Sequence, residues 1–484
     1  MIVFSFNLAA AAQPIFYATH EVWNLMIQLG IIAVLLLAAN YLRRRIPLIQ
    51  KSLMPVSVLA GFMMLALKLI VSRGFGVQDL FDPEALDALV YHCIALGFIA
   101  MSLRTVREGR EGNSVAGVQS GATIVGAYLV QGLTGLIIMI LLSLTIMPDL
   151  FKAGGLLLPM GYGQGPGQAN NIGMTYESYG FAGGQSFGLA IAAAGYLCAC
   201  TVGVLVLNFW KKRRLLTDRA AGKEVEETLT VDYFQGTNEI PVSDSIDRLS
   251  VQIALVLAVY IVTYLVTLGL TSALTTWAPG LGKLLNSMLW GFNFIIGSAF
   301  AMLAKTLLGS AHRHGLMKRK YQNNYLLNRL SGLFFDIMIV AGIACIDPED
   351  LSGLWLPFVL MAVAGGAVTW VYLKKVSKSI YEGYYHEGLI SMYGMMTGTI
   401  ASGVLLLREI DPELSTPAAN NLVVGSSYGI LFGAPLLILV TMAAKSDLMC
   451  YIVVGIIIVY FTMLMLIIRF FNRRKREQAK KETK

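Results

Sequence analysis

Eleven apolar runs, each close to the length that crosses a bilayer, dominate this chain of 484 residues. A transmembrane helix needs about 20 apolar residues, and inside lipid only helices or closed barrels satisfy their own backbone hydrogen bonds. The chain is 56% hydrophobic and only 14% charged, whereas soluble proteins carry about 25% charged residues. The sequence therefore predicts an all-α polytopic membrane protein with spans at 22–41, 53–72, 86–103, 122–146, 181–210, 249–271, 285–308, 324–345, 353–374, 418–444 and 447–470.

A glycine-rich stretch at 154–177 interrupts this pattern between two apolar runs. Its glycines and Pro166 prevent a continuous helix, because glycine costs about 1 kcal/mol and proline about 3 kcal/mol in a helix interior. It also carries amides that would lack hydrogen-bond partners in lipid. Non-helical backbone at membrane depth is tolerated only where protein buries it or where it lines a wet cavity. We therefore expect a re-entrant hairpin over 153–178, with two half-helices that meet at a polar tip.

A second stretch, at 393–399, repeats the Tyr-Gly-x-x-x-Gly pattern of 162–167. A polar tail follows each copy, and the second one contains Thr399 and Ser402. Paired, interrupted apolar segments in the two halves of a chain are the best sequence pointer to a transporter binding site. We expect a second re-entrant hairpin over 380–407.

Basic residues account for the net charge of +8 and gather in a few loops and in the C-terminal tail. This distribution indicates loops on the cytoplasmic side rather than a nucleic-acid partner. The basic clusters lie at 43–45, 104–110, 211–214, 313–320, 374–378 and 473–476. They alternate correctly only if the first hairpin enters and leaves from outside and the second from inside. The N-terminus is then outside and the C-terminus is cytoplasmic.

The two halves of the chain therefore begin on opposite sides of the membrane. Residues 1–210 form a first membrane repeat, 211–248 a polar cytoplasmic linker, 249–446 a second repeat, and 447–484 an extra span with a basic tail. Each repeat has about five spans and one hairpin. Inverted-topology repeats of this kind are a common plan of secondary transporters.

The hairpin tips supply the candidate site. Half-helix N-termini present free N–H groups and partial positive charge, which suit a carboxylate, and each amide side chain both donates and accepts. In the alternative interpretation, the amides only cap the half-helices. The candidates for substrate contact are Gly163, Gln164, Gly165, Gly167, Gln168, Asn170, Asn171, Gly394, Gly398, Thr399 and Ser402.

Asp336 lies well inside its predicted span, and ionisable residues inside a membrane are functional candidates by default. It is able to bind a cation, carry a coupling proton, or pair with Lys305 or Arg329. We expect a sodium site from Thr397, Thr399 and Asp336, with sodium as the coupling ion and no other cofactor.

Two other functional classes fit less well. The Gly161-Tyr162-Gly163 sequence is similar to a potassium-channel filter, but Pro159 precedes it and an inverted repeat does not supply four copies around one axis. An enzyme would need a nucleophile with a base, or a carboxylate pair, near the hairpins. No Ser/His or Asp/Asp spacing there provides one, so we expect no enzymatic activity.

Three short motifs carry a resemblance to a known family. Pro55 with residues 58–61, the glycine-rich residues 165–169, and residues 394–399 occur where the glutamate:sodium symporters of bacterial inner membranes have corresponding motifs. The chain resembles that family over roughly 22–444. The resemblance implies sodium-coupled uptake of glutamate, homodimers, and an elevator-type movement of the hairpin-bearing part against a scaffold.

The first hairpin departs from the family pattern at three positions. Gln164 stands where the first motif glycine is usual, Pro166 at the variable position, and Gln168 where threonine or a small residue is common. The span at 447–470 also goes beyond the usual ten. These departures leave another organic anion open as the substrate.

Overall fold

The computed structural model describes residues 20–75, 81–104, 114–213, 215, 247–277, 286, 289–291, 293–317, 321–411 and 416–482. Within these ranges every regular element is a helix. The first half contains α1 (His20–Arg45), α2 (Pro47–Lys51), α3 (Val56–Phe75), α4 (Pro83–Leu103), α5 (Ser114–Thr145), η2 (Lys152–Leu156), α6 (Leu157–Tyr162), α7 (Pro166–Glu177) and α8 (Gly184–Lys212). The second contains α10 (Asp247–Trp277), α12 (Asn293–Arg313), α13 (Asn324–Cys345), α14 (Trp355–Ile380), α15 (Tyr385–Thr397), α16 (Ile400–Arg408), α17 (Ala418–Ala443) and α18 (Asp447–Glu482). Most of the predicted linker 211–248 lies outside the described residues.

Nine helices in the described part of the chain are long and apolar enough to cross a membrane: α1, α4, α5, α8, α10, α12, α13, α14 and α18. The prediction of an all-helical polytopic membrane protein is thereby confirmed. The other two predicted spans differ in detail. The apolar part of α3 is the shorter Val56–Ser72, and α17 bends by 52° between Ala418–Ile430 and Phe432–Ala443. Pro435 lies in that bent region, and its ring removes an N–H and displaces the preceding turn.

Local signals explain where two of the central helices begin. Asp82 caps α4 by accepting a hydrogen bond from the Glu84 N–H, with Pro83 at the first helical position. Asn323 caps α13 in the same way by accepting from the Leu326 N–H at 2.9 Å. Side-chain acceptors at these positions satisfy N–H groups that have no partner inside the helix.

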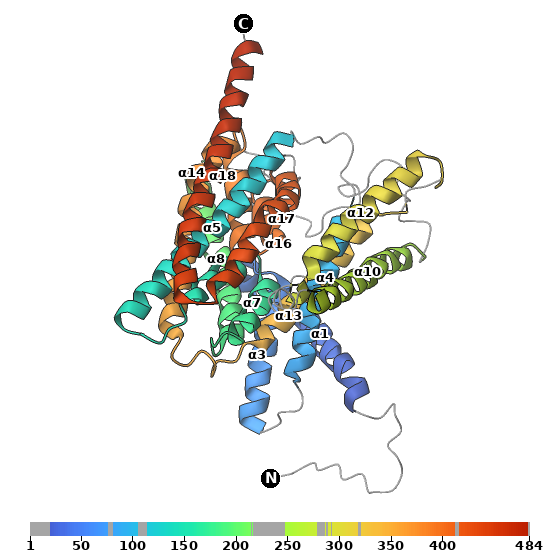
Figure 1. Ribbon diagram of the computed structural model, residues 1–484, viewed down its shortest axis with the longest axis vertical. Helices are drawn as coiled ribbons and strands as arrows, with labels where there is room; N and C mark the ends of the chain where they lie inside the picture. Colours follow the sequence, from blue (N-terminus) through green and yellow to red (C-terminus); the bar gives the residue numbers. More distant parts are fainter. Residues whose placement is uncertain are drawn as a thin grey trace.

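The helices pack as two groups, which we call group A and group B. Group A contains α1, α3, α4, α10, α12 and α13, and group B contains α5 to α8 and α14 to α18. Figure 1 shows most of group B on the left and α10 and α12 of group A on the right. The groups meet chiefly where α13 packs against α7 and α8, and where α4 packs against α7.

Each half of the chain contributes to both groups in the same order. The first three long helices of each half enter group A, and the helices that follow enter group B. In group A, α1 packs on α3 and α3 on α13, while α10 packs on α12 and α12 on α4. The two third helices, α4 and α13, pack on each other, and so do the two fourth helices, α5 and α14.

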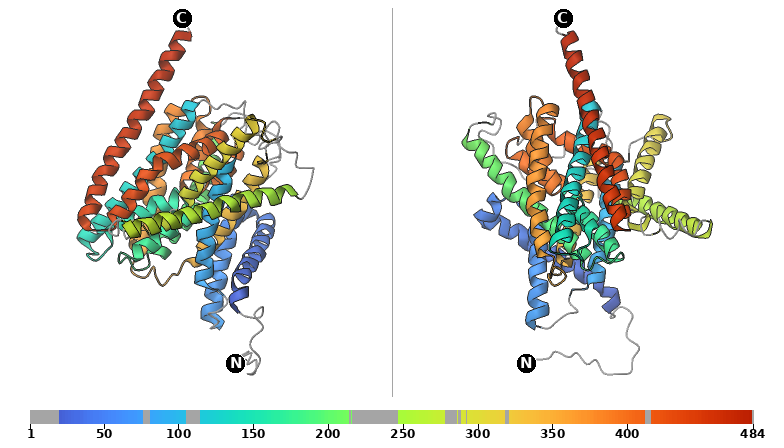
Figure 2. Two further views of the ribbon diagram at one scale, coloured as in Figure 1. Left: turned by 45° about the vertical axis from the view of Figure 1, so that its right-hand side comes forward. Right: turned by 60° about the vertical axis from the view of Figure 1, so that its left-hand side comes forward.

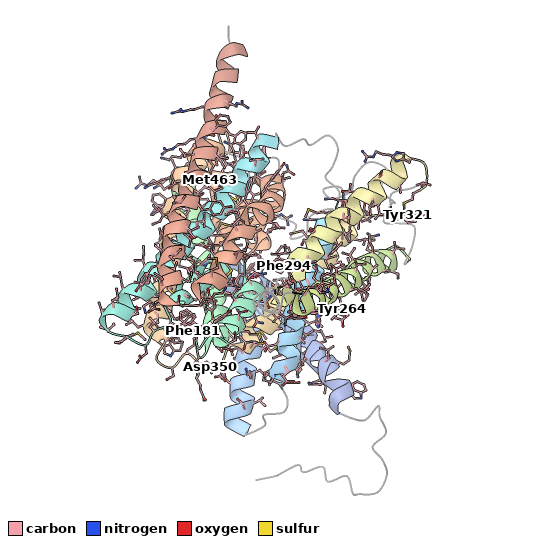
Figure 3. The ribbon with its side chains drawn as sticks, in the orientation of Figure 1. Phe181, Tyr264, Phe294, Tyr321, Asp350 and Met463 are labelled. Carbon is pink, nitrogen blue, oxygen red and sulfur yellow. The ribbon has the colours of Figure 1, made fainter. Side chains whose placement is uncertain are left out.

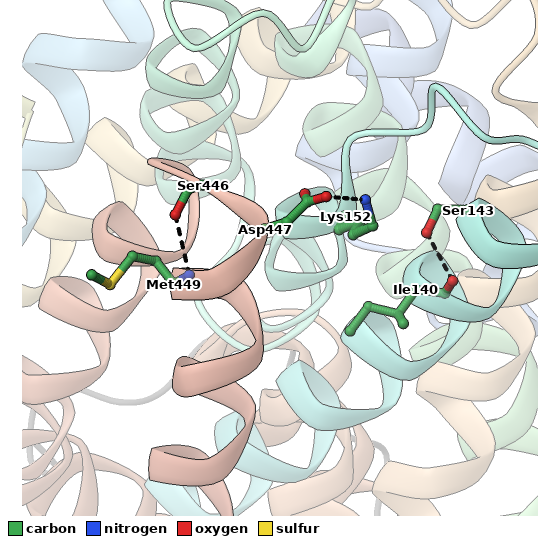
Figure 4. A network of polar contacts seen from close by, with 6 residues as sticks. All are labelled: Ile140, Ser143, Lys152, Ser446, Asp447 and Met449. Carbon is green, nitrogen blue, oxygen red and sulfur yellow. Dashed lines mark hydrogen bonds and ion pairs between the residues drawn. The ribbon is translucent and has the colours of Figure 1, made fainter.

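The last helix, α18, packs along α5 and α17 in group B. Its C-terminal part extends beyond the other helices (Figure 2). Its first residue, Asp447, accepts a hydrogen bond from Lys152 of η2 at 2.5 Å (Figure 4). This carboxylate raises the pKa of the Lys152 ammonium. A small cavity of about 260 Å³ adjoins the pair, between the loops before η2 and before α18.

Group B also contains a very close backbone crossing, between α5 and η2. A Cβ atom added to Gly155 would lie 2.3 Å from the carbonyl carbon of Gly135, and one added to Gly135 would lie 2.0 Å from the Gly155 oxygen. Only glycine permits this approach. It holds the start of the first broken helix against α5.

Candidate functional site

The first candidate segment, 153–178, forms two short helices with a break between them. Helix α6 ends at Tyr162, α7 begins at Pro166, and Gly165 before it has φ of +87°, which favours glycine. At 1.5 Å per residue, the six residues of α6 and the twelve of α7 extend about 9 Å and 18 Å. Neither half reaches across the roughly 30 Å hydrocarbon core of a bilayer.

Both halves lie along α8, and their contacts give their directions. In α6, Leu157 lies beside Gly188 and Gly161 beside Ala192, so α6 runs in the same direction as α8. In α7, Ala169 lies beside Gly188 and Gly173 beside Gln185, so α7 runs in the opposite direction. The chain therefore folds back on itself at residues 163–165.

The second candidate segment, 380–407, has the same construction. Helix α15 ends at Thr397 and α16 begins at Ile400, with Gly398 and Thr399 between them. A Cβ atom on Gly394 would lie 2.9 Å from the Gly403 Cα, and these glycines lie at similar distances from the break on its two sides. The two halves therefore fold back against each other through a glycine contact.

The two breaks meet in space, although more than 230 positions separate them in the sequence. A Cβ atom on Gly165 would lie 4.0 Å from the Thr399 Cγ2 atom and 3.8 Å from the Tyr196 hydroxyl. Nearby, one on Gly195 would lie 2.5 Å from the Thr397 carbonyl oxygen. Residues 195 and 196 of α8 thus lie between the two breaks, which we call tip 1 (163–165) and tip 2 (398–399).

Helix N-termini face this meeting point from both sides. Helix α7 begins at tip 1 and α16 begins at tip 2, and neither Gly165 nor Thr399 makes a side-chain cap to its own helix. Neither first turn contains an acidic residue. Uncapped N–H groups and the helix dipole make such ends favourable for negative charge.

Unsatisfied polar atoms occur in both broken segments and in α8 beside them. Both amide atoms of Gln168 and the Ser402 hydroxyl are buried without a hydrogen-bond partner in the described residues. The buried Tyr196 hydroxyl makes no hydrogen bond of good geometry there, although the Thr399 side chain lies close enough to interact with it. Buried polar atoms of folded proteins are nearly always paired, and each exception needs an explanation such as an absent water or ion. A bound polar ligand between the tips would supply the missing partners.

Three predicted site residues instead have structural partners. Asn170 accepts a hydrogen bond from Gln185 at 2.9 Å, Asn171 donates to the Gly291 carbonyl at 3.0 Å, and Thr397 donates to the Tyr393 carbonyl at 2.8 Å. These contacts favour the interpretation in which the asparagines satisfy protein groups.

The glycines of the predicted site allow close packing, and Gln164 is half-buried. Gly163 packs against the ring of Tyr128, and Gly167 against Ile94 and Met338. These contacts leave Gly165, Gln168, Gly398, Thr399 and Ser402 as the predicted residues nearest the meeting point of the tips.

Asp336 lies in the middle of α13 and its side chain is exposed, although Ser57, to which it is hydrogen-bonded, is buried. It is close enough to Tyr196 to interact with it electrostatically. It forms no ion pair with Lys305 or Arg329 among the described residues, and Arg329 stacks on Tyr325 instead. Of the three alternatives for Asp336, the described residues therefore do not favour pairing with these basic residues, and binding of a cation or a proton stays open.

Sequence reasoning missed Tyr196, because a tyrosine in an apolar run carries no signal of its own. It also missed a polar cluster at the start of α8. The Gln185 amide donates to Asp87 of α4 at 2.6 Å as well as to Asn170, and Ser186 donates to Asp350 at 2.8 Å. The bond between Gln185 and Asp87 connects group B to group A at one end of their interface.

No group of three His, Cys, Asp or Glu side chains able to hold a metal ion occurs in the part of the chain that is described. A sodium site at the tips would therefore use hydroxyl and carbonyl oxygens with at most one carboxylate. No protein-family model matches the chain, and no curated protein is similar to it. The resemblance to the glutamate:sodium symporters rests on the three motifs alone and stays a prediction.

Proposed function

We propose that the protein is a secondary active transporter that couples sodium entry to the uptake of glutamate or a closely related organic anion. The observation that carries the proposal is the meeting of Gly165 and Thr399, which brings two broken helices from the two halves of the chain to one point. Discontinuous helices whose ends face each other from corresponding repeats are typical of substrate sites in secondary transporters.

The packing of the two halves supports an inverted repeat. Helices α1, α3, α4, α5, α6–α7 and α8 correspond in order to α10, α12, α13, α14, α15–α16 and α17, and the packing within group A follows the same pattern in both halves. In the proposal both broken segments are re-entrant hairpins, α18 is an extra span, and group B moves against group A in an elevator-type cycle.

The distribution of predicted loops supports the proposed orientation. Phe181 and Asp350, both expected outside, lie in the lower half of Figure 3, whereas Tyr321, which follows a basic loop expected inside, lies in the upper half. We place the protein in the bacterial inner membrane as a homodimer, with its N-terminus outside and its C-terminus in the cytoplasm.

Asp336 favours a second candidate for the coupling ion. Its side chain is exposed and has no basic partner among the described residues, although it lies at the middle of a membrane helix. A charged carboxylate in such a place raises the free energy of the folded protein unless it binds a cation or a proton. Proton coupling through Asp336 is therefore the alternative to sodium coupling.

The deciding experiment is radiolabelled glutamate uptake into proteoliposomes. An inward sodium gradient is compared with a choline gradient and with a pH gradient alone. Accumulation that requires sodium supports the proposal, and uptake driven by the pH gradient alone assigns coupling to protons. Counterflow of labelled against unlabelled substrate separates a carrier from a channel, because a channel does not exchange its substrate in this way.

Thr399→Val tests the site itself. The change keeps the size of the side chain at tip 2 but removes the hydroxyl, so the apparent affinity for sodium or glutamate should fall while membrane insertion is retained. Thr201→Val is the matched control, because the Thr201 hydroxyl is exposed and donates to the Leu197 carbonyl of its own helix at 2.7 Å. Unchanged uptake kinetics in Thr399→Val would remove this residue from the site.

A further inference from the structure

We propose that Tyr196 is a substrate-contact residue whose hydroxyl donates a hydrogen bond to the carboxylate of the transported anion between the two tips. This inference rests on the proposed transport function and deepens it. It adds a residue of the long helix α8 to a site otherwise built from the two broken helices.

The position of the hydroxyl is the first part of the argument. It lies 3.8 Å from the point that a Cβ atom of Gly165 would occupy, and Thr399 of tip 2 approaches the same point to 4.0 Å. The Tyr196 side chain is 1% exposed. A ligand that contacts both tips therefore comes within reach of this hydroxyl.

The hydroxyl makes no hydrogen bond of good geometry among the described residues, although the Thr399 side chain of tip 2 lies close enough to interact with it. A buried polar group without a well-formed hydrogen bond is destabilising, and phenylalanine would fill the same space without that cost. A tyrosine at this place therefore puts a hydroxyl beside tip 2 without a well-formed hydrogen bond to the protein. Gln168 and Ser402, each buried with unpaired atoms, belong to the same two broken helices.

The surroundings of the Tyr196 hydroxyl indicate the charge of the ligand group that binds there. The uncapped N-termini of α7 and α16 both begin at the tips and favour negative charge. A phenol is neutral near pH 7 and donates its proton to an anionic oxygen without losing it. Three donor groups of two kinds thus converge on one carboxylate: the two helix ends and the Tyr196 hydroxyl.

Asp336 gives this arrangement a link to ion coupling. Its negative charge acts on Tyr196 and on any anion held beside it. An anion between the tips is repelled until Asp336 carries a cation or a proton, because like charges at close range raise each other's free energy. Binding of the coupling ion therefore favours binding of the anion, and the reverse also holds by linkage.

Tyr196→Phe is the test, measured in the full-length protein. A hydrogen bond to a charged group contributes about 1.5–3 kcal/mol, which corresponds to a rise of about 10- to 140-fold in the KM for glutamate at saturating sodium. The melting temperature without substrate should change little, because the removed hydroxyl makes no well-formed hydrogen bond to the protein. A structural role would lower the melting temperature instead.

Tyr176→Phe is the matched control. The Tyr176 ring is also fully buried, but its hydroxyl donates to the Val440 carbonyl at 2.9 Å. This variant should melt at a lower temperature and keep its KM. An unchanged KM in Tyr196→Phe, or the same loss of stability and affinity in both variants, would overturn the proposal.

Failure of the proposed function is recognised separately. If the wild-type protein does not transport glutamate, its thermal stabilisation by a panel of mono- and dicarboxylates replaces uptake as the readout. A carboxylate that stabilises the wild type but not Tyr196→Phe supports the role of Tyr196 with another substrate. Stabilisation of both to the same extent, or no stabilisation by any carboxylate, contradicts it.

Discussion

The crossing of α5 and η2 allows one substitution to be worked through from the structure. In Gly155→Ala the new methyl carbon would lie 2.3 Å from the Gly135 carbonyl carbon, whereas ordinary contacts of this type begin at 3.4 Å. The two backbones must therefore separate by about 1.1 Å, the difference between these two distances. No rotamer change relieves the clash, because both partners are backbone.

The expected cost lies at the upper end of the range for overpacking, about 3 kcal/mol. The melting temperature of the purified protein should fall by several degrees, since about 1 kcal/mol shifts large domains by roughly 2–4 °C. Uptake should fall as well, because η2 leads directly into α6 and tip 1. Intrinsic tryptophan fluorescence during heating in detergent measures the first effect.

Gly30→Ala is the control for the chemical change. Gly30 lies within α1, and nothing lies within 4 Å of its added Cβ atom. Alanine is the better helix former by about 1 kcal/mol, so this variant should melt at the same temperature or slightly higher. If both variants melt like the wild type, the close crossing does not exist in the folded protein and the reasoning fails.

Two further changes test the ends of group B. Gln185→Leu removes the bonds to Asp87 and Asn170, so groups A and B should separate more readily at that end. The Cys345 thiol donates to Asp87 and reports on this end of the interface. In a protein with Cys345 as its single cysteine, a membrane-impermeant maleimide should label this thiol several-fold faster when Gln185→Leu is added. Equal labelling rates with and without Gln185→Leu would show that the bonds do not hold the groups together. Lys152→Met removes the ion pair with Asp447, whose carboxylate is 66% exposed, and should cost at most about 1 kcal/mol. The loss of stability should disappear in about 1 M choline chloride, where the Debye screening length is about 3 Å. A difference in stability between Lys152→Met and the wild type that persists there would mean that Lys152 stabilises the protein through packing instead.

The sequence was sufficient to predict the long helices and the two breaks, but not the contact between the breaks. Apolar runs of the right length predicted each long helix, and the glycines with Pro166 placed both breaks within a few residues, because these signals are local. The contact between Gly165 and Thr399 is not local, and it depends on α8, whose apolar residues show nothing of it. For the same reason Asn170 and Asn171 looked like Gln168 in the sequence, although Gln185 and Gly291 satisfy the first two and no described residue satisfies the third.

The packing of both broken helices along α8 has a consequence for how the site handles ligands of different size. Leu157 and Ala169 meet α8 at Gly188, and Thr397 meets it at Gly195. The distance between the two tips is therefore set by the spacing of small residues along the single helix α8, and the loops of the broken helices contribute little to it. Residues on the outer faces of both hairpins can then vary while the distance between the tips stays the same. Selection for a longer or shorter ligand would therefore act first on α8.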